Sequence, residues 1–358
     1  LPYEDGHVFV SPISISVAMA MVYEGARGIS ERQLEDVLGY QDVGLNKASI
    51  SSSVQHLLRS ADDLSSGITL KGANAMLVQK GYPVQRNYET VLRDFFHART
   101  QEVDFVNDNA RAVADVNQWV SEQTGGQISN VVDSFPDDTV IFVMNAIYFK
   151  GTWQVKFDRE RTAELPFYNN GEESKLVETM FSYDKYRYGS DSHLNADIVE
   201  LPYKGKEFSM IILLPRDRRG LKGLVRSLSL SLLRSALNRL TEQDVKLKLP
   251  KLKLETELSL VDPLRRLGAE SIFGPNANLT GISVANHLRV TDVFHKAVVE
   301  VNEEGSEASA FTGITGGGLA IPVTQQAPVE MTVDHPFLFC IRHVKRNLII
   351  FLGLVNVI

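Results

Sequence analysis

Residues 300–312 read Glu300-Val-Asn-Glu-Glu-Gly-Ser-Glu-Ala-Ser-Ala-Phe-Thr312, and this stretch is the most informative part of the chain. A charged strand end leads into a lone glycine, after which small residues alternate with polar or bulkier ones. Because successive side chains of a strand point to opposite faces, one face would be buried and the other wet. The buried face would carry Ser306, Ala308, Ala310 and Thr312, and the other Glu307, Ser309 and Phe311. The glycine run Gly316–Gly318 then joins this segment to an exposed loop, which predicts a switch rather than a scaffold.

The composition is that of an ordinary soluble globular protein, with 358 residues, 44% hydrophobic and 23% charged. The length allows two or three domains, and one large domain is also common at this size. The single cysteine, Cys340, lies in the apolar run Phe337–Ile341, which predicts a buried, inert thiol and excludes internal disulfides. The net charge of −7 argues against nucleic-acid binding. No apolar run approaches the length of a membrane span.

The chain carries no visible signal peptide and does not begin with methionine, so we expect a mature or truncated form. The triplet Asn278-Leu-Thr280 follows the turn-like residues Gly274-Pro275-Asn276. It is compatible with glycosylation of Asn278 in a secreted protein.

Local patterns predict an α+β fold. Helices are expected from Ser11-Pro12 to near Gly25, after a capping box at Ser30–Gln33 and up to Gly39, and over Asn109–Thr124. Val140–Phe149 is expected to be a central strand. Two hairpins are expected, Ile198–Tyr203 with Phe208–Leu214, and Pro336–His343 with Leu348–Val355. Helices and strands do not alternate regularly, which favours large, mainly antiparallel sheets over a doubly wound sheet.

Motifs of catalysis, phosphate binding and metal binding are absent from the sequence: there is no GxGxxG, P-loop, HExxH, GxSxG or CxxC. Ser11, Ser14, Asn145 and His295 could be drawn as a hydrolase constellation. We prefer a buried hydrogen-bond network, because serines at a helix start and an asparagine in an apolar strand usually serve that purpose. The chain is therefore not expected to be an enzyme or to hold a metal.

Several collinear motifs resemble those of the serpin superfamily, over nearly the whole chain. They are Phe9–Ile15 with Gly25–Gly28, Asn117–Thr124 with Gly126–Ile128, Asn145–Trp153, His295–Ala297 with Glu303–Ala308, Pro336–Phe339, and Phe351–Gly353. The resemblance implies one serpin domain over residues 1–358, with a reactive-centre loop at about 305–335. Family members usually carry a helix before the first of these motifs, whereas only Leu1–His7 precede it here, so that helix is absent or not included.

The resemblance implies a suicide inhibitor of proteases that is a secreted, extracellular monomer. The protease attacks the loop and forms an acyl-enzyme, and the cleaved loop then inserts as a strand into the main sheet. By resemblance the hinge is Glu303, Gly305, Ser306, Glu307, Ala308, Ser309 and Ala310. The shutter beneath the sheet is Ser11, Ser14, Asn145 and His295, and the breach, where entry begins, is Trp153 and Glu303.

The resemblance places the reactive bond at Leu319–Ala320, with Gly305 as the fifteenth residue before it. Counting back from Pro336 instead would move the bond toward Gln325. No Lys or Arg occurs from Ala297 to Ile341, so the acidic pocket of a trypsin-like protease would stay unfilled. Leu319 favours a chymotrypsin-, elastase- or cathepsin G-like partner, and cysteine proteases with a hydrophobic preference remain an alternative.

Two other functions stay open at this point. A non-inhibitory serpin could act as a binding or carrier protein, although the small-residue hinge argues against it. A glycosaminoglycan could act as a cofactor through a basic stretch, although such runs are usually solvated helix faces. The stretch comprises Arg216, Arg218, Arg219, Lys222, Arg226, Arg234 and Arg239.

Overall fold

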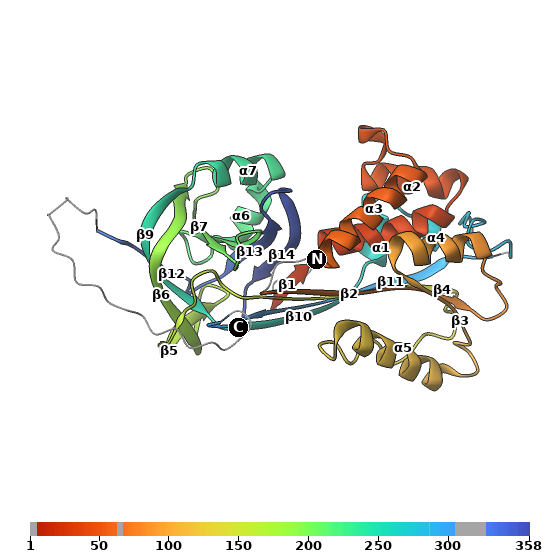
Figure 1. Cartoon of the computed structure of the whole chain (residues 1–358), viewed down its shortest axis with the longest axis horizontal. Helices are drawn as coiled ribbons and strands as arrows, with labels where there is room; N and C mark the ends of the chain where they lie inside the picture. Colours follow the sequence, from red (N-terminus) through yellow and green to blue (C-terminus); the bar gives the residue numbers. More distant parts are fainter. Residues whose placement is uncertain (1–5, 63–66, 286, 305–326) are drawn as a thin grey trace.

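The computed structural model describes residues 6–62, 67–285, 287–304 and 327–358. Within them the chain forms one sheet of five strands and one of nine, with helices around both. Figure 1 shows the five-stranded sheet in the middle of the molecule and most of the nine-stranded sheet at one end. The predicted hinge residues other than Glu303, from Gly305 to Ala310, and the predicted bond Leu319–Ala320 lie outside the described residues.

The helices and strands are bounded as follows. The helices are α1 Pro12–Gly25, α2 Gly28–Leu38, α3 Lys47–Asp62, α4 Arg86–Phe96, α5 Asn109–Thr124, α6 Leu221–Ser227, α7 Leu230–Asn238 and α8 Val261–Leu267, with 3-10 turns at Gln41–Val43 and Ser271–Phe273. The strands are β1 His7–Val10, β2 Ile68–Gln79, β3 Arg99–Val103, β4 Ile141–Gly151, β5 Asp158–Asn169, β6 Glu173–Asp191, β7 Ala196–Pro202, β8 Phe208–Pro215, β9 Thr241–Pro250, β10 Leu252–Ser259, β11 Val290–Val301, β12 Val329–Thr332, β13 Phe337–His343 and β14 Leu348–Val355.

The five-stranded sheet has the order β10-β11-β4-β2-β3. Its middle pair, β4 and β11, is parallel, and so is the edge pair β2 and β3. The nine-stranded sheet has the path β1-β14-β13-β8-β7-β6-β9-β12, with β5 paired to β6. There only β12 and β9 pair in parallel, so the described pairs are mainly antiparallel, as the sequence predicts.

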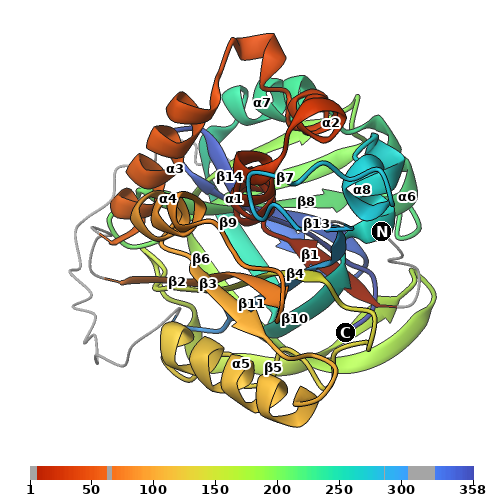
Figure 2. The ribbon, with the colours of Figure 1, turned by 90° about the vertical axis from the view of Figure 1, so that its right-hand side faces the viewer.

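Both faces of the five-stranded sheet are covered, which explains why β4 is apolar along nearly all of its length. Figure 2 shows α5 on one face and the group of α1 to α4 on the other. Phe142, Met144 and Ala146 of β4 pack in the cluster that contains α5, whereas Ile141 and Val143 pack in the cluster that contains α1. The helix α1 is hydrophobic on all sides and buried from Val17 to Tyr23, as expected for a helix inside a core.

Most of the predicted elements are present with nearly the predicted bounds. Ser11 caps α1, and α5 ends at Thr124, where it is followed by Gly125 in a left-handed conformation. Both predicted hairpins form, as β7–β8 and β13–β14. Cys340 is fully buried, and burial raises the pKa of its thiol to about 12.

The predicted capping box at Ser30–Gln33 is wrong. The helix α2 begins at Gly28, two residues before Ser30, and no side chain caps it. The Ser30 hydroxyl instead accepts a hydrogen bond from the backbone N–H of Asn278 at 3.0 Å, and the Ser271 hydroxyl donates to it at 3.0 Å. The Ser30 hydroxyl is therefore occupied by tertiary hydrogen bonds and does not cap α2.

The close packing of β14 yields the first prediction. A Cβ atom at Gly353 would lie 2.3 Å from Cε1 of Phe339 and 2.7 Å from Cβ of Phe9. We expect Gly353→Ala to lower the free energy of unfolding by about 1–3 kcal/mol, because overpacking forces the neighbouring rings to move. Urea unfolding followed by fluorescence measures this change.

The matched control is Gly223→Ala in α6, where an added Cβ would meet nothing within 4 Å. There the substitution should raise the free energy of unfolding by roughly 0.5–1 kcal/mol through helix propensity. A Gly353→Ala variant as stable as the unsubstituted chain would contradict the packing argument.

Candidate functional site

The parallel strands β4 and β11 pair at the centre of the five-stranded sheet, with one register shift between Val290 and Asp292. The pairing runs from Val290 opposite Ile141 to Val299 opposite Phe149, and we call it the β4–β11 seam. Because the strands are parallel, their carboxyl ends lie at the same edge of the sheet. Glu304, the last described residue before Gly305, lies three residues beyond β11. The segment that carries the hinge therefore leaves the sheet where the seam ends.

The four predicted shutter residues lie together beneath the seam. Asn145 and His295 are directly opposite each other, and Nδ1 of His295 lies 2.6 Å from Oδ1 of Asn145. The Ser14 hydroxyl donates to the same oxygen at 2.6 Å. The backbone N–H of Ser11 donates to Nε2 of His295 at 3.2 Å. The sequence therefore identified a set of side chains that α1, β4 and β11 bring into one hydrogen-bonded network.

Asn74 is a fifth member that the sequence analysis missed. It lies in β2 directly opposite Asn145, and Nδ2 of Asn145 donates to Oδ1 of Asn74 at 2.6 Å. His295, Asn145 and Asn74 thus form a polar row across three adjacent strands. The available signal was a lone amide among the small and apolar residues 72–78. We call Ser11, Ser14, Asn74, Asn145 and His295 the shutter network.

The shutter network is unsuited to hydrolysis. Burial lowers the pKa of His295 to about 4, so the ring is neutral at pH 7. Since Nε2 accepts the Ser11 N–H, the ring donates from Nδ1 to Asn145. Among the described residues no hydroxyl is bonded to His295, and the Ser14 hydroxyl is bonded to an amide oxygen. A nucleophilic serine needs a base within hydrogen-bond reach, and this network does not provide one.

The predicted breach residues anchor the chain just after β11. Nε1 of Trp153 donates to the carbonyl of Asn302 at 2.7 Å, and the Trp153 ring stacks on Tyr203 with centroids 4.4 Å apart. Oε1 of Glu303 accepts from the Thr162 hydroxyl at 2.9 Å and lies 3.4 Å from Nζ of Lys251. Burial would raise the pKa of Glu303, but these contacts and its own backbone N–H together lower it. The carboxylate is thus held charged where the hinge begins.

Comparison with known proteins decides the family. A family model described as Serpin (serine protease inhibitor) matches residues 2–357. Iripin-8 of Ixodes ricinus is 43% identical over 359 residues, which cover 99% of this chain and 89% of Iripin-8. The chain belongs to the serpin family. This serpin is also 39% identical to the leukocyte elastase inhibitor of Bos taurus, over 97% of this chain and 92% of that protein.

Solved structures confirm the predicted serpin fold. The crystal structure of uncleaved ovalbumin matches with a TM-score of 0.87 and 29% sequence identity, over 98% of this serpin and 93% of that chain. The family model is described as a serine protease inhibitor and the relative from Bos taurus is named as an elastase inhibitor, which agrees with the predicted class of function.

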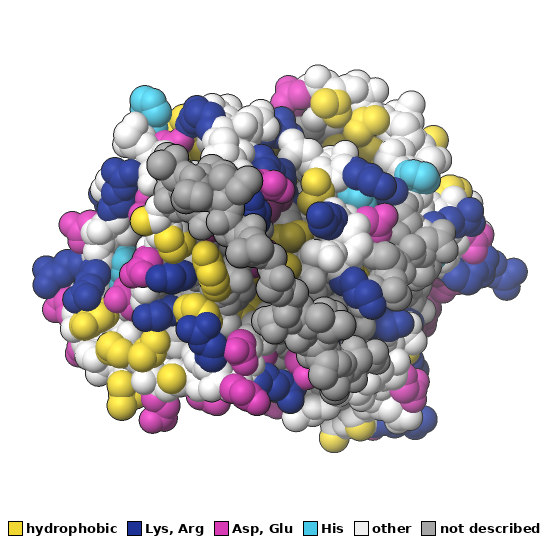
Figure 3. Space-filling view, turned by 60° about the vertical axis from the view of Figure 1, so that its left-hand side comes forward, with side chains coloured by type: hydrophobic (Ala, Val, Ile, Leu, Met, Phe, Trp, Pro, Cys, Tyr) yellow, Lys and Arg dark blue, Asp and Glu magenta, His cyan; other side chains and the backbone are white. Residues whose placement is uncertain are grey.

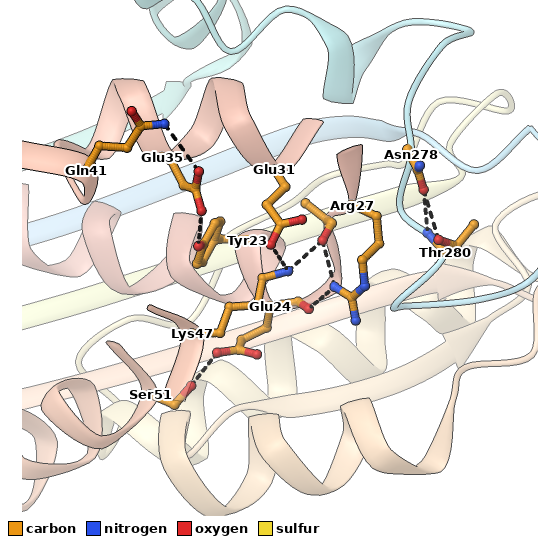
Figure 4. A network of polar contacts seen from close by, with 11 residues as sticks. Tyr23, Glu24, Arg27, Glu31, Glu35, Gln41, Lys47, Ser51, Asn278 and Thr280 are labelled. Atoms are coloured by element: carbon orange, nitrogen blue, oxygen red, sulfur yellow. Dashed lines mark hydrogen bonds and ion pairs between the residues drawn. The ribbon is translucent and has the colours of Figure 1, made fainter. Parts of the chain in front are cut away.

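Figure 4 shows the predicted glycosylation site, Asn278, in a close-up view together with Thr280 and a nearby network of polar side chains. Asn278 is half-buried, and the exposed Thr280 donates its hydroxyl to Oδ1 of Asn278 at 2.9 Å. Beside them, Nζ of Lys47 contacts Oε1 of Glu31 at 2.8 Å and the carbonyl of Ala26 at 2.7 Å. Glycosylation of Asn278 and secretion stay predictions from the sequence.

Most of the predicted basic stretch is engaged in ion pairs. Arg216 pairs with Asp197, Arg218 with Asp334, Arg219 with Glu172 and Arg239 with Asp191. These carboxylates offset much of the positive charge that a polyanion would need. Binding of a glycosaminoglycan therefore stays a prediction from sequence. The described residues contain no cluster of His, Cys, Asp and Glu that could hold a metal ion and no helix long and apolar enough to span a membrane.

The outer face of the sheet formed by β5, β6, β9 and β12 presents basic and aromatic side chains beside the carboxyl end of the predicted loop. Figure 3 shows hydrophobic and basic side chains mixed on this side of the molecule. A shallow hollow there is lined by Arg161, Phe181, Tyr183, Lys246 and Lys248 among others.

The low pKa of His295 makes stability depend on pH. The unfolded chain binds a proton near pH 6.5 and the folded chain only near pH 4, so the unfolded state gains protons as the pH falls between these values. Stability is therefore fully present above pH 6.5 and falls by about 2 kcal/mol at pH 4.5. In His295→Gln, whose amide keeps one donor and one acceptor, this part of the loss should vanish. Urea unfolding of both proteins at pH 7 and pH 4.5 measures the difference, and equal pH dependence would contradict the assignment.

Proposed function

We propose that this serpin irreversibly inhibits a chymotrypsin- or elastase-like serine protease. The protease cleaves the loop after Leu319, and the segment after Glu304 inserts between β4 and β11 while the protease is still covalently attached. The observation that carries the proposal is the parallel seam, which ends where this segment leaves the sheet.

The seam favours insertion for a topological reason. A segment that leaves the carboxyl end of β11 and turns back runs antiparallel to both β11 and β4. One parallel interface would be replaced by two antiparallel ones, which are slightly more stable per residue. Serpin loop insertion is a recognised case of strand addition.

The length of the segment is sufficient to displace a bound protease. The fifteen residues from Gly305 to Leu319 would span about 50 Å at ~3.3 Å each. A compact chain of this size has a radius of gyration of about 20 Å and hence a diameter near 50 Å. Full insertion would therefore carry the attached protease from one pole of the serpin to the other.

The shutter network would control this opening. Separating β4 from β11 breaks the bond between His295 and Asn145, whereas the bonds from Asn145 to Ser14 and Asn74 can persist. A buried polar group left without a partner costs about 1–3 kcal/mol. The network thus adds to the barrier to opening and leaves the β2–β4 pair intact.

The choice of protease follows from the loop sequence. The stretch from Ala297 to Ile341 contains no Lys or Arg, and Leu319 suits a hydrophobic specificity pocket. The name of the leukocyte elastase inhibitor supports an elastase-like partner. A cysteine protease with hydrophobic preference is the alternative within the same mechanism. We further propose that the protein acts outside the cell, where such proteases are found.

The test is incubation with chymotrypsin, neutrophil elastase, cathepsin G and trypsin, followed by denaturing electrophoresis. A covalent complex with one of the first three supports the proposal. Cleavage of the loop without any complex and without a rise in melting temperature would overturn it in favour of a binding or carrier role.

The small-residue face of the hinge yields a mutational prediction. Ser306→Arg would place an unpaired charge on the face that must be buried, so the variant should be cleaved as a substrate and lose nearly all covalent complex. Ser309→Arg is the matched control, because Ser309 falls on the opposite face and should still form the complex. The ratio of complex to cleaved serpin on a denaturing gel measures both. Equal complex formation by the two variants would contradict the predicted face.

The position of the reactive bond yields a second prediction. Leu319→Arg should convert the serpin into an inhibitor of trypsin, because the acidic pocket of trypsin binds arginine. Gln325→Arg should do so instead if the bond lies at the later position. Second-order rates of trypsin inhibition distinguish the two, and mass spectrometry of the released fragment identifies the bond directly.

A further inference from the structure

A hollow of about 430 Å³ opens on the face of the five-stranded sheet that α5 covers, beside the carboxyl end of that helix (Figure 2). Thr69 and Lys71 of β2 and Tyr148 and Lys150 of β4 form its floor, and the residues that follow α5 line one wall. Successive side chains of a strand point to opposite faces, so Tyr148 points away from the face that carries Asn145. The hollow is therefore separate from the shutter network.

The register of β2 and β4 brings four polar side chains together on this floor. Lys71 lies directly opposite Tyr148, and Thr69 lies directly opposite Lys150. Residues directly opposite each other in an antiparallel pair have Cβ atoms about 5 Å apart, and diagonal neighbours are about 7–8 Å apart. Lys71 and Lys150 therefore occupy one diagonal of a small square and place two positive charges on either side of its centre.

The hydroxyl of Tyr148 is a free donor in this floor. Tyr148 is only 3% exposed and lines the hollow, and among the described residues its hydroxyl has no hydrogen-bond partner. Burial, with a smaller contribution from the charge of Glu300, raises the pKa of Tyr148 to about 12, so the hydroxyl keeps its proton at pH 7. Buried tyrosine hydroxyls usually have a partner. The Tyr148 hydroxyl is thus available to a ligand oxygen.

The positive charge of the hollow is largely uncompensated. Lys71 is exposed and forms no ion pair with any described residue. Nζ of Lys150 lies 3.8 Å from Oε2 of Glu300, which is too long for a hydrogen bond, and the other oxygen of Glu300 accepts from Nδ2 of Asn302 at 2.9 Å. No Asp or Glu occurs among the described residues that line the hollow. The site therefore favours an anion.

The two lysines are not needed to cap α5. The carboxyl end of a helix carries a partial negative charge that lysines can offset. Here the backbone N–H groups of Gly125 and Gly126 donate to the carbonyls of Glu122 and Ser121, at 3.2 and 2.7 Å. The last turn is therefore closed by its own backbone, and both ammonium groups are left for a ligand.

We propose that this hollow binds a small phosphate monoester. The phosphate group lies between Lys71 and Lys150 and accepts the hydrogen bond from the hydroxyl of Tyr148, while its polar organic body lies toward the exposed Gln127. The hydroxyl of Thr69 is a further donor. A phosphate monoester carries close to two negative charges at pH 7 and three acceptor oxygens, which matches two ammonium groups and several hydroxyl donors. A carboxylate has one charge and only two oxygens and satisfies fewer of these groups.

The site would persist if the seam opened, because its floor belongs to the β2–β4 pair. Glu300 belongs to β11, so a strand inserted between β4 and β11 would move Glu300 away from Lys150. The ligand would then meet the full charge of Lys150 and bind more tightly. This consequence rests on the proposed inhibitory function, whereas the binding itself does not.

The probe is glucose 6-phosphate, with glucose 6-sulfate, gluconate and glucose as comparisons, in a buffer free of phosphate and sulfate. By calorimetry, glucose 6-phosphate should bind with one site per chain. Glucose 6-sulfate, which has the same shape and one charge fewer, and gluconate, which carries a carboxylate, should bind at least severalfold more weakly, and glucose should not bind. No detectable binding of glucose 6-phosphate at 10 millimolar, or equal binding of the sulfate and the phosphate, would overturn the proposal.

Substitutions place the ligand in this hollow. Lys71→Glu should weaken binding of glucose 6-phosphate by about tenfold or more, whereas Lys185→Glu should not, because Lys185 is also exposed but does not line the hollow. Tyr148→Phe removes only the hydroxyl and should also weaken binding by about tenfold. Since that hydroxyl has no partner among the described residues, Tyr148→Phe should leave the melting temperature unchanged. Unchanged affinity in both Lys71→Glu and Tyr148→Phe would show that the ester binds elsewhere and overturn the proposal.

The competing charge of Glu300 gives a test with the opposite sign. Glu300→Gln should tighten binding of glucose 6-phosphate severalfold, because Lys150 then has no carboxylate beside it. All of these measurements are made without a protease, so they stand even if no protease is inhibited. Where loop cleavage raises the melting temperature, the cleaved serpin should bind the ester as tightly as Glu300→Gln. Equal affinity before and after such a rise would overturn the link to insertion and leave the binding site in place.

Discussion

The parallel pairing of β4 with β11 determines how firmly the five-stranded sheet stays closed. Parallel pairs are slightly less stable per residue than antiparallel ones, and this one lies in the middle of a sheet that helices cover on both faces. The covering helices and the shutter network therefore contribute to keeping the sheet closed. The same arrangement leaves a place for a strand that would run antiparallel to both neighbours.

The polar row of His295, Asn145 and Asn74 raises the barrier to opening of the sheet more than it raises the free energy of unfolding. A buried hydrogen bond contributes only about 0.5–1.5 kcal/mol net, whereas breaking it without replacement costs about 1–3 kcal/mol. His295 and Asn145 pair across the seam, while Asn74 ties Asn145 to β2. A sheet closed in this way is held most strongly against partial opening, and an inserted strand could supply new partners once opening is complete.

Local signals explain what the sequence could predict. The bounds of α1 and α5, the two hairpins and the central strand follow from caps, glycines and apolar runs, and the structure confirms them. The prediction of a capping box at Ser30 was wrong because Ser271 and Asn278, which are distant in sequence, form hydrogen bonds with the Ser30 hydroxyl. Asn74 was missed because its role depends on the register between β2 and β4.

Asn145 connects the protonation of His295 with the strand pairs on both sides of β4. A proton on Nε2 of His295 would displace the bond from Ser11 and weaken the seam, whereas the bond from Asn145 to Asn74 holds β2 and β4 together. Protonation would therefore bias the closed–open equilibrium toward the open sheet. Linkage requires the effect to be reciprocal, so opening of the seam must favour the charged histidine.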